Sequence, residues 1–384
     1  METIYLDHAA TTQVDPRVLE AMLPWLQGEF GNASSIHTLG RAANVAVEEA
    51  REKIAHYLSC TPSEIIFTSG GTESDNTAIL GVLASSNRKE CITSNAEHHA
   101  VLYPVEMAQH FGFQSKVLPV SKTGIIETKH LASELSEQTA IVSLMHVNNE
   151  NGAINPIKEL AAITHKNGSI FHTDAVQSAG KFSLDIEDLG VDLLSISGHK
   201  LYGPKGVGVL FAKAGIEFEP FMIGGSQERK RRAGTLNVPG IIGLGKAIEL
   251  AITEMSERSN HISKLKSYLQ NGLSNSYGDQ IQFNNPIGND AYHIVSISFL
   301  SKNEKYLDGE MLLLNLDIEG ICCSNGSACS SGAIEPSHVL LAMGVPSKTA
   351  KSSLRLSLGK DNTVEQLDYV LEKLDKITKR MGLG

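Results

Sequence analysis

Residues 195–206 read SISGHKLYGPKG. The apolar run Leu193–Ser197 before this stretch predicts a buried strand, and Lys200 follows it directly among glycines. Most lysines are solvated surface groups. A lysine held in an interior crevice loses water, so its pKa falls and its amine becomes a nucleophile able to form a Schiff base. The stretch therefore predicts a strand that ends at a reactive lysine.

A second polar group follows the preceding predicted strand, residues 169–173. There the chain reads FHTDAVQ, residues 171–177, with Asp174 directly after the strand. Open α/β sheets bind ligands at the carboxyl ends of their strands. Asp174 and Lys200 are then expected to point into one crevice, where the carboxylate pairs with a cationic ring nitrogen. From its residue type alone, Asp174 is equally suited to capping a helix.

Further upstream, residues 67–73 read FTSGGTE between a predicted strand and a predicted helix. Glycines and a helix N-terminus favour an anion, so the Gly71 and Thr72 amides and the Thr72 hydroxyl are candidates to hold a phosphate. No Gly-Lys-Ser/Thr follows, so this is not a Walker loop. Taken alone, the residues favour an ordinary tight turn with Thr as a helix cap. Ser197 and His199 are candidates to complete this phosphate-binding site, which we call the phosphate cup. The phosphate cup, the aspartate and the lysine are together the groups that pyridoxal phosphate requires.

The chain alternates predicted strands and helices in the βαβ manner, which indicates an α/β fold with a large, mostly parallel sheet covered by helices on both faces. The predicted strands are residues 65–68, 140–147, 169–173, 193–197 and 207–212, and the predicted helices are 41–58, 72–84 and 156–167. The character changes near the polar stretch 255–260, after which a smaller α+β domain is expected. Its elements are a helix at 261–273, strands at 294–299 and 354–358, and a closing helix at 364–381.

These stretches together resemble the cysteine desulfurases of the NifS/IscS-like group, within the class V aminotransferase family of pyridoxal-phosphate enzymes. The matching motifs are YLDHAATT, FTSGGTESDN, AEHHAV, MHVNNENG, HTDAVQSAGK, SISGHKLYGPKG, RRAGTLNVPGIIG, NGSACSSGAIEPSHVL and SSLRLSLGK, in this order from residue 5 to about 360. The resemblance implies the fold type I of these enzymes, with a seven-stranded sheet in a large domain at 14–258. It also implies a small α+β domain made of 1–13 and 259–384, and a homodimer.

The resemblance also implies residue roles. Lys200 is the Schiff-base lysine, Asp174 the partner of the pyridine nitrogen, and Gln177 a donor to the phenolic oxygen of the cofactor. His98 stacks on the cofactor ring, and Asn149 and Arg355 grip the substrate carboxylate, which suits the planar fork of arginine. Thr235 is a phosphate contact donated by the neighbouring subunit. The residues alone indicate less: a lone histidine is more often structural, and Arg355 in the alternating strand SLRLSL reads as a surface residue.

The five cysteines are too few, and odd in number, for a disulfide framework, which favours a reducing compartment such as the cytoplasm. Cys329 lies in the small-residue stretch SNGSACSSG, residues 324–332, where we expect an exposed thiol on a mobile loop. The loop, about 324–335, has a contour near 40 Å at about 3.3 Å per residue. The resemblance implies that Cys329 accepts sulfur. Cys60 and Cys91 are expected in the core, and Cys322 and Cys323 at a buried strand end rather than in a metal site.

Composition excludes several functional classes. With 33 Lys+Arg against 43 Asp+Glu, the net charge of −10 disfavours a nucleic-acid binder. The basic run 229–232 is interpreted as a local feature beside a bound anion or as a surface that contacts a partner. No apolar segment is long enough for a membrane span, and no secretory signal is expected.

The resemblance implies removal of sulfur from L-cysteine, giving L-alanine and a persulfide on Cys329. The sulfur then passes to an acceptor such as an iron–sulfur scaffold protein. The alternatives are a selenocysteine lyase or related lyase of the family, a simple aminotransferase, and a non-catalytic sulfur carrier or scaffold.

Overall fold

The computed structural model describes residues 3–301, 306–326 and 335–383. Its largest element is a seven-stranded sheet in the order β2-β8-β7-β6-β5-β3-β4. The strands span Ile65–Thr68 (β2), Glu90–Ser94 (β3), Gln114–Leu118 (β4), Thr139–Ser143 (β5), Ile170–Asp174 (β6), Leu193–Ser197 (β7) and Gly208–Ala212 (β8). Only β8 runs antiparallel to its neighbours within this sheet. The prediction of a mostly parallel sheet is confirmed.

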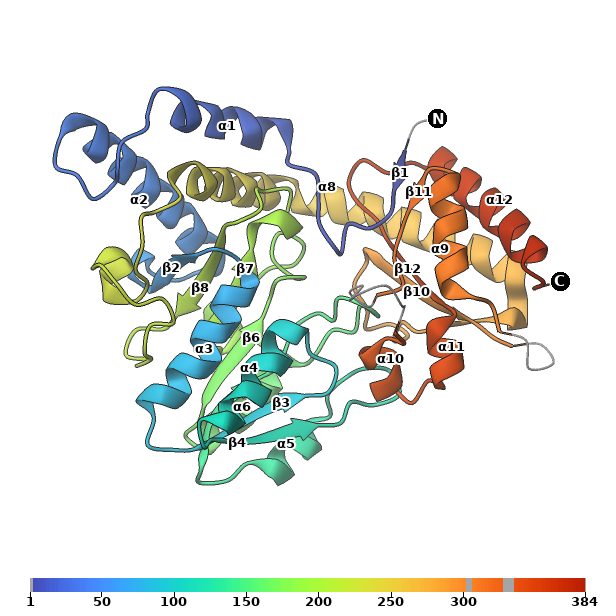
Figure 1. Cartoon of the computed structure of the whole chain (residues 1–384), viewed down its shortest axis with the longest axis horizontal. Helices are drawn as coiled ribbons and strands as arrows, with labels where there is room; N and C mark the ends of the chain where they lie inside the picture. Colours follow the sequence, from blue (N-terminus) through green and yellow to red (C-terminus); the bar gives the residue numbers. More distant parts are fainter. Residues whose placement is uncertain (1–2, 302–305, 327–334, 384) are drawn as a thin grey trace.

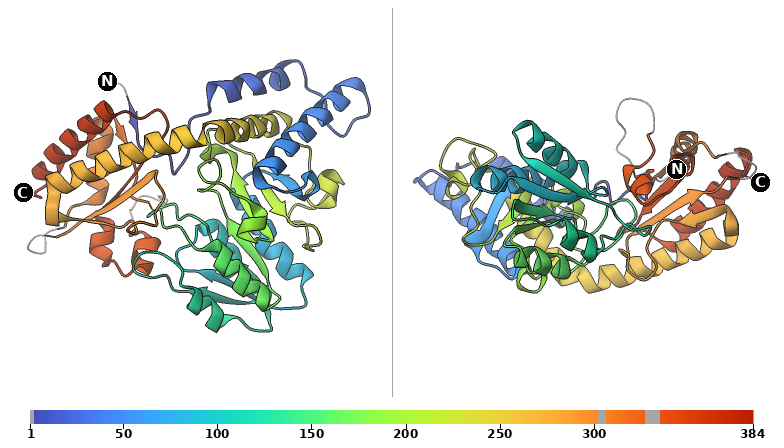
Figure 2. Two further views of the ribbon diagram at one scale, coloured as in Figure 1. Left: turned by 180° about the vertical axis from the view of Figure 1, so that it is seen from behind. Right: turned by 90° about the horizontal axis from the view of Figure 1, so that it is seen from below.

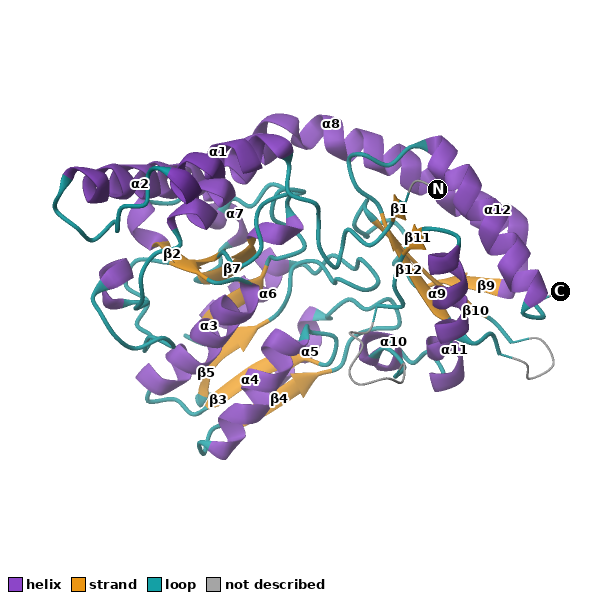
Figure 3. Cartoon of the chain, turned by 45° about the horizontal axis from the view of Figure 1, so that its top comes forward, coloured by secondary structure: helices purple, strands orange, loops and turns teal. Residues whose placement is uncertain are grey.

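Helices pack along both faces of this sheet (Figure 3). The helices of this part of the chain are α1 (Pro16–Gln27), α2 (Thr38–Leu58), α3 (Gly71–Ser85), α4 (His99–His110), α5 (Thr128–Glu134), α6 (Ile157–Lys166) and α7 (Ile186–Leu189), with 3₁₀ turns η1 (Pro62–Glu64), η2 (Gly198–Lys200) and η3 (Gln227–Lys230). Successive strand residues face opposite sides, so Leu210 packs with α3 and α4, whereas Val209 and Phe211 pack with α2 and α6. The alternation fixes a separate apolar cluster on each face.

A smaller group of elements lies at the other end of the molecule (Figure 1). It contains β1 (Ile4–Tyr5), β9 (Ile281–Phe283), β10 (Ile294–Phe299), β11 (Ile321–Cys322), β12 (Ser353–Ser357), α9 (Gly309–Ile318), α10 (His338–Ala342), α11 (Ser347–Lys351), α12 (Val364–Arg380) and the 3₁₀ turn η4 (Gly278–Gln280). Strands β12, β10 and β9 form an antiparallel sheet, and β1 pairs in parallel with β11. The sheet and α12 share one apolar cluster. The domain bounds at 14–258 and 259–384 stay a prediction.

One long helix, α8 (Val238–Tyr277), joins the two groups (Figure 2). Its first half packs Leu244 and Ile248 against the large sheet, and its second half packs Leu265 and Leu269 into the smaller cluster. The predicted helix at 261–273 is therefore wrong in extent. The polar stretch 255–260 is the part of α8 that passes between the two cores, where little apolar surface is needed.

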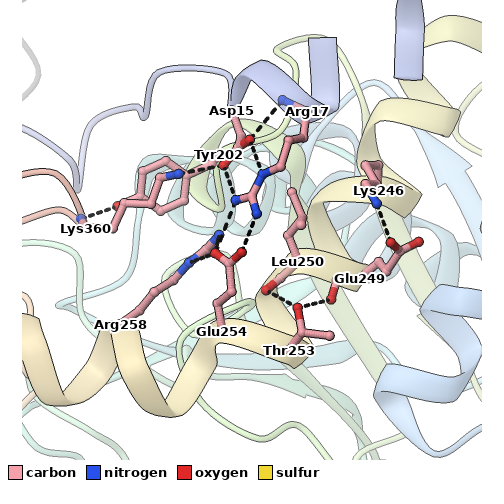
Figure 4. Close-up of polar contacts among 10 residues, drawn as sticks. All are labelled: Asp15, Arg17, Tyr202, Lys246, Glu249, Leu250, Thr253, Glu254, Arg258 and Lys360. Carbon is pink, nitrogen blue, oxygen red and sulfur yellow. Dashed lines mark hydrogen bonds and ion pairs between the residues drawn. The ribbon is translucent and has the colours of Figure 1, made fainter. Parts of the chain in front are cut away.

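Charged groups hold the junction between α1, α8 and the segment after β12 (Figure 4). Asp15 pairs with Arg17 at 2.8 Å and with Lys360 at 2.5 Å, and Arg17 also contacts Glu254 of α8. The Lys360 backbone N–H donates to the Tyr202 hydroxyl at 2.8 Å. Since Tyr202 follows Lys200 by two residues, this network connects the large-sheet elements and the smaller group of elements to η2, the turn that carries Lys200.

The predicted strand 140–147 is also corrected. β5 ends at Ser143, although the Leu144 and His146 N–H groups still donate to the carbonyls of His172 and Asp174. Beyond the sheet proper, this segment turns along the strand ends, where Met145 and Val147 line the cavity described next.

Candidate active site

A cavity of about 750 Å³ lies at the carboxyl ends of β6 and β7. Ten of the residues predicted for the site line it. They are Gly71, Thr72, His98, Asn149, Asp174, Gln177, Ser197, His199, Lys200 and Arg355. Thr235 is exposed and does not line this cavity. Cys329 lies outside the described residues, but Gly326, three residues before it, is part of the cavity wall.

Lys200 projects from η2, the single turn that follows β7. Its Nζ donates to the carbonyls of Ala9 and Ala10 at 2.6 and 2.8 Å, so the N-terminal segment covers the amine. Burial, and then the positive charge of Arg355, lower the pKa of Lys200 to about 8, against an opposing effect of Asp174. The unprotonated fraction of this amine near neutral pH is therefore far larger than that of an ordinary lysine.

Lys200 in cofactor-free protein should react with acetic anhydride with a pH midpoint near 8, well below the ordinary lysine value of 10.5. Only the unprotonated amine reacts, so labelling rises with pH through that midpoint. Competitive acetylation read by mass spectrometry measures it. In Asp174→Asn the midpoint should fall further, because the carboxylate that raises this pKa is lost. A midpoint near 10.5 in the unaltered chain would contradict the described environment.

Asp174 is the last residue of β6, and Ser195 of β7 lies beside it in parallel register. Its Oδ1 accepts the Val176 N–H at 2.8 Å. The reading of Asp174 as a helix cap is wrong, because the residues after it form turns and no helix. Burial raises the pKa of Asp174 to about 6, and a cationic group placed against it would lower that pKa and favour the ionised carboxylate.

The N-terminus of α3 opens onto the same cavity. α3 begins at Gly71, and no side chain of the described residues caps its first turn. The reading of Thr72 as a helix cap is therefore wrong, because Thr72 lies inside the helix with its backbone N–H near the open end. A Cβ on Gly71 would lie 2.7 Å from a Val176 methyl carbon, so only glycine fits there. The arrangement leaves free N–H donors facing the cavity, which suits an anion.

His98 is oriented by the helix that it precedes. It is the N-cap of α4, and its Nδ1 accepts the Ala100 N–H at 3.0 Å. The ring proton is then on Nε2. Burial in the cavity wall, and then the charge of Lys200, lower the pKa of His98 to about 4, so the ring is neutral at physiological pH. Burial also lowers the pKa of His199 to about 4, and its Nδ1 lies 3.0 Å from the Thr11 hydroxyl.

Arg355 is buried, at 5% exposure, so its interpretation as a surface-strand residue is wrong. Although β12 is the last strand of its sheet, a bridge between Arg355 and Ser324 covers its open edge. The guanidinium pairs with Asp7 at 2.8 Å and donates to the Asn149 carbonyl at 2.8 Å. Its Nε has no partner among the described residues. Arg355 thus lines the cavity with an Nε–H group that no described residue accepts, so this group is available to a bound molecule.

Sequence reasoning assigned no role to several groups around the cavity. Asp7 pairs with Arg355, and only its place in the YLDHAATT motif pointed to it. Asp75 lines the cavity wall, and burial, then the neighbouring Asp174 charge, raise its pKa. Lys181 donates to the Lys200 carbonyl at 2.9 Å. Asp75 and Lys181 stand in the motifs FTSGGTESDN and HTDAVQSAGK, but residue type alone does not show that either side chain packs against the site.

The remaining cysteines lie as follows. Cys91 is buried in the α3–α4 cluster, and Cys60 is half-buried against the opposite cluster. Cys322 ends β11 and Cys323 follows it, but both are half-buried rather than buried as predicted. Across residues 3–301, 306–326 and 335–383, no three His, Cys, Asp or Glu side chains gather as a metal ion would need. In the same part of the chain, no helix combines the length and apolar character that crossing a membrane demands.

Comparison with known proteins agrees with this geometry. The aminotransferase class-V family model matches residues 4–370, so the chain belongs to that family. It is 47% identical to the cysteine desulfurase IscS of Dictyoglomus turgidum, over 98% of this chain and 95% of the relative. It is 45% identical to the cysteine desulfurase IscS of Methanosarcina thermophila, over 99% of this chain and 93% of that relative. A solved NifS-like protein superposes with a TM-score of 0.91 at 38% identity, covering 98% of this chain and all of that one. Within its family, the chain belongs to the cysteine desulfurases of the IscS and NifS type.

Proposed function

We propose that the chain removes sulfur from L-cysteine with pyridoxal phosphate as cofactor, leaving L-alanine and a persulfide on Cys329. The observation that carries this proposal is the meeting of Lys200, Asp174 and Arg355 in one cavity. A nucleophilic amine, a buried carboxylate and a carboxylate-binding guanidinium are the groups that an amino-acid-processing cofactor enzyme needs. The experiment that tests it is the release of alanine and sulfur from L-cysteine by the purified protein.

The residues present fit pyridoxal phosphate. The uncapped start of α3 offers backbone N–H groups to the phosphate, beside Ser197 and His199. Asp174 would face the pyridine nitrogen. The Gln177 nitrogen donates to the Ala9 carbonyl at 2.8 Å, which leaves its second N–H for the phenolic oxygen. When bound, the cofactor supplies an electron-withdrawing ring that stabilises negative charge at the carbon bearing the amine.

The chain's own groups divide the remaining work. Lys200, with its lowered pKa, takes the proton from the substrate carbon and returns it later. Arg355 and Asn149 hold the substrate carboxylate, which orients the sulfur away from them. His98, neutral and fixed by its N-cap bond, presents a flat ring for stacking and a single N–H.

The sulfur transfer is a displacement at sulfur. The Cys329 thiolate attacks the substrate sulfur, so an S–S bond forms and the Cβ–S bond breaks. The electron pair of that bond stays on carbon, which is protonated to give alanine. Because Gly326 lines the cavity, a span of three residues, about 10 Å, suffices to bring Cys329 to the substrate.

Arg355→Lys should raise the KM for L-cysteine by about 10- to 100-fold with a smaller change in kcat, because a lysine cannot bind a carboxylate bidentately. Steady-state alanine production measures both constants. Arg258→Lys is the matched control, since Arg258 is also buried and paired, with Glu254, but does not line the cavity. An unchanged KM in Arg355→Lys would remove this residue from the substrate-binding site.

We propose a homodimer in which Thr235 of one subunit contacts the phosphate bound by the other. Thr235 is exposed, and so are the nearby apolar residues Phe221, Met222 and Ile223, which a second subunit would cover. The acceptor of the Cys329 sulfur is proposed to be a protein such as an iron–sulfur scaffold. The cytoplasm is the proposed compartment, because the five cysteines, few and odd in number, favour a reducing compartment over one in which disulfides form.

A further inference from the structure

Residues 224–235, the basic loop, connect the region after β8 to α8 and carry the basic run 229–232 and Thr235. Figure 1 shows this segment in yellow-green beside α2. It is exposed over most of its length, yet one acidic side chain within it, Glu228, is 6% exposed. A buried carboxylate in an exposed basic loop calls for a partner.

That partner is Arg51 of α2. The two Glu228 oxygens accept from Arg51 Nη2 at 2.8 Å and from Nη1 at 2.9 Å. One of them also accepts the Phe67 N–H of β2 at 2.9 Å, and Arg51 donates to the Ile65 carbonyl at 2.7 Å. Glu228 is thus tied to a helix and a strand of the large sheet. Removing one partner of such a buried pair leaves the other charge unpaired, which is costly.

The backbone beside this pair is unusual. Glu228, Arg229 and Lys230 have φ values of 43°, 57° and 67°, three consecutive left-handed residues that are not glycine. Side chains disfavour this region, and such a conformation persists only where surrounding contacts impose it. The Glu228 contacts are therefore among the bonds that hold the course of the basic loop, and they are the ones nearest the left-handed residues.

A second ion pair joins the loop to the phosphate cup. Arg232 donates to both Glu73 oxygens, at 2.8 and 3.2 Å, and Glu73 lies in the first turn of α3 and accepts the Ser69 N–H. Thr235 follows three residues later but does not line the cavity of its own chain. The basic loop is therefore anchored beside the phosphate cup of its own chain, while Thr235 is exposed to solvent.

We propose that Glu228 is a positioning residue that fixes the basic loop, so that Thr235 reaches the phosphate cup of a second copy of this chain. The inference rests on the proposed dimer and cofactor, and goes beyond them by assigning Glu228 an effect on the partner's site rather than its own.

Hybrid dimers with one intact Lys200 each, purified through two tags, test this directly. In the first hybrid, a Glu228→Gln chain pairs with a Lys200→Ala chain, so the intact Lys200 faces an unaltered loop. In the second, a chain carrying both substitutions pairs with an unaltered chain, so the intact Lys200 faces the altered loop. After a timed chase that removes released cofactor, borohydride fixes what remains on Lys200, and mass spectrometry gives the fraction labelled.

The second hybrid should release cofactor about tenfold faster than the first, the effect of losing one hydrogen bond to a charged group. The first hybrid should release cofactor at the same rate as a hybrid of an unaltered chain and a Lys200→Ala chain. Equal release in both hybrids, or faster release in the first, would overturn the proposal. Failure of unaltered dimers to label Lys200 would instead count against the proposed cofactor.

Glu48→Gln is the matched control, because Glu48 contacts the same Arg51 at 3.1 Å, and Arg229 of the basic loop at 3.9 Å, but with a side chain that is 41% exposed, where an ion pair contributes little. It should leave cofactor release unchanged in both hybrids, and an acceleration equal to that of Glu228→Gln would overturn the role assigned to Glu228. If Glu228→Gln does not fold, Arg51→Lys replaces it, since it weakens the same pair while keeping the charge. The same asymmetry between hybrids is expected.

Discussion

Lys200→Ala should abolish the release of alanine and sulfur from L-cysteine, a loss of about 10³-fold or more. The reason is that one amine both anchors the cofactor and moves the substrate proton, and loss of a group that acts in bond formation and proton transfer removes more than either alone. Its short contacts with the Ala9 and Ala10 carbonyls fix the amine in the cavity wall. Initial rates of alanine formation measure the effect.

Lys213→Ala is the matched control, because Lys213 is exposed at the end of β8, away from the cavity. It should retain full activity. Lys200→Ala should also lose the ability to retain cofactor after borohydride treatment, while its thermal unfolding changes little. Alanine formation at more than a few per cent of the normal rate in Lys200→Ala would transfer the catalytic role to another amine, with Lys181 the first to examine.

Cys329→Ser should stop sulfide release from L-cysteine in the presence of a reductant while leaving the visible absorption of the bound cofactor intact. A serine hydroxyl is not ionised near neutral pH and does not attack sulfur, whereas a thiolate does. The variant should also produce no alanine, because the Cβ–S bond breaks only when an acceptor takes the sulfur.

Cys60→Ser and Cys322→Ser are the matched controls, since both replace free cysteines outside the cavity wall. Each should keep sulfide release close to that of the unaltered chain. If Cys329→Ser retained normal release and either control lost it, the sulfur acceptor would be a different cysteine.

The sequence was most informative where function depends on a strand end. Lys200 and Asp174 follow buried strands, and because parallel strands end at one edge of a sheet, their meeting in one cavity was predictable from local patterns. Arg355 was not, since its burial depends on Ser324, Asp7 and Asn149, which come from distant segments. A strand pattern alone does not say what will cover its edge.

The same limit explains why no role was predicted for Asp7 or Lys181, although both stand in the motifs that carry the family resemblance. Asp7 and Lys181 act through contacts with Arg355 and the Lys200 carbonyl, made by segments far apart along the chain. The extent of α8 was missed for a different reason. Polar residues at 255–260 look like a linker, but they are the middle of a helix whose two halves pack in separate cores.

The central claim is that sulfur from L-cysteine moves onto Cys329. Mass spectrometry of the peptide containing Cys329, after a brief exposure of the purified protein to L-cysteine without reductant, tests this most directly. We expect one added sulfur atom on Cys329 and one alanine formed for each modified chain. Alanine formed with Cys329 unmodified, or the added sulfur on Cys322 or Cys323, would contradict the account.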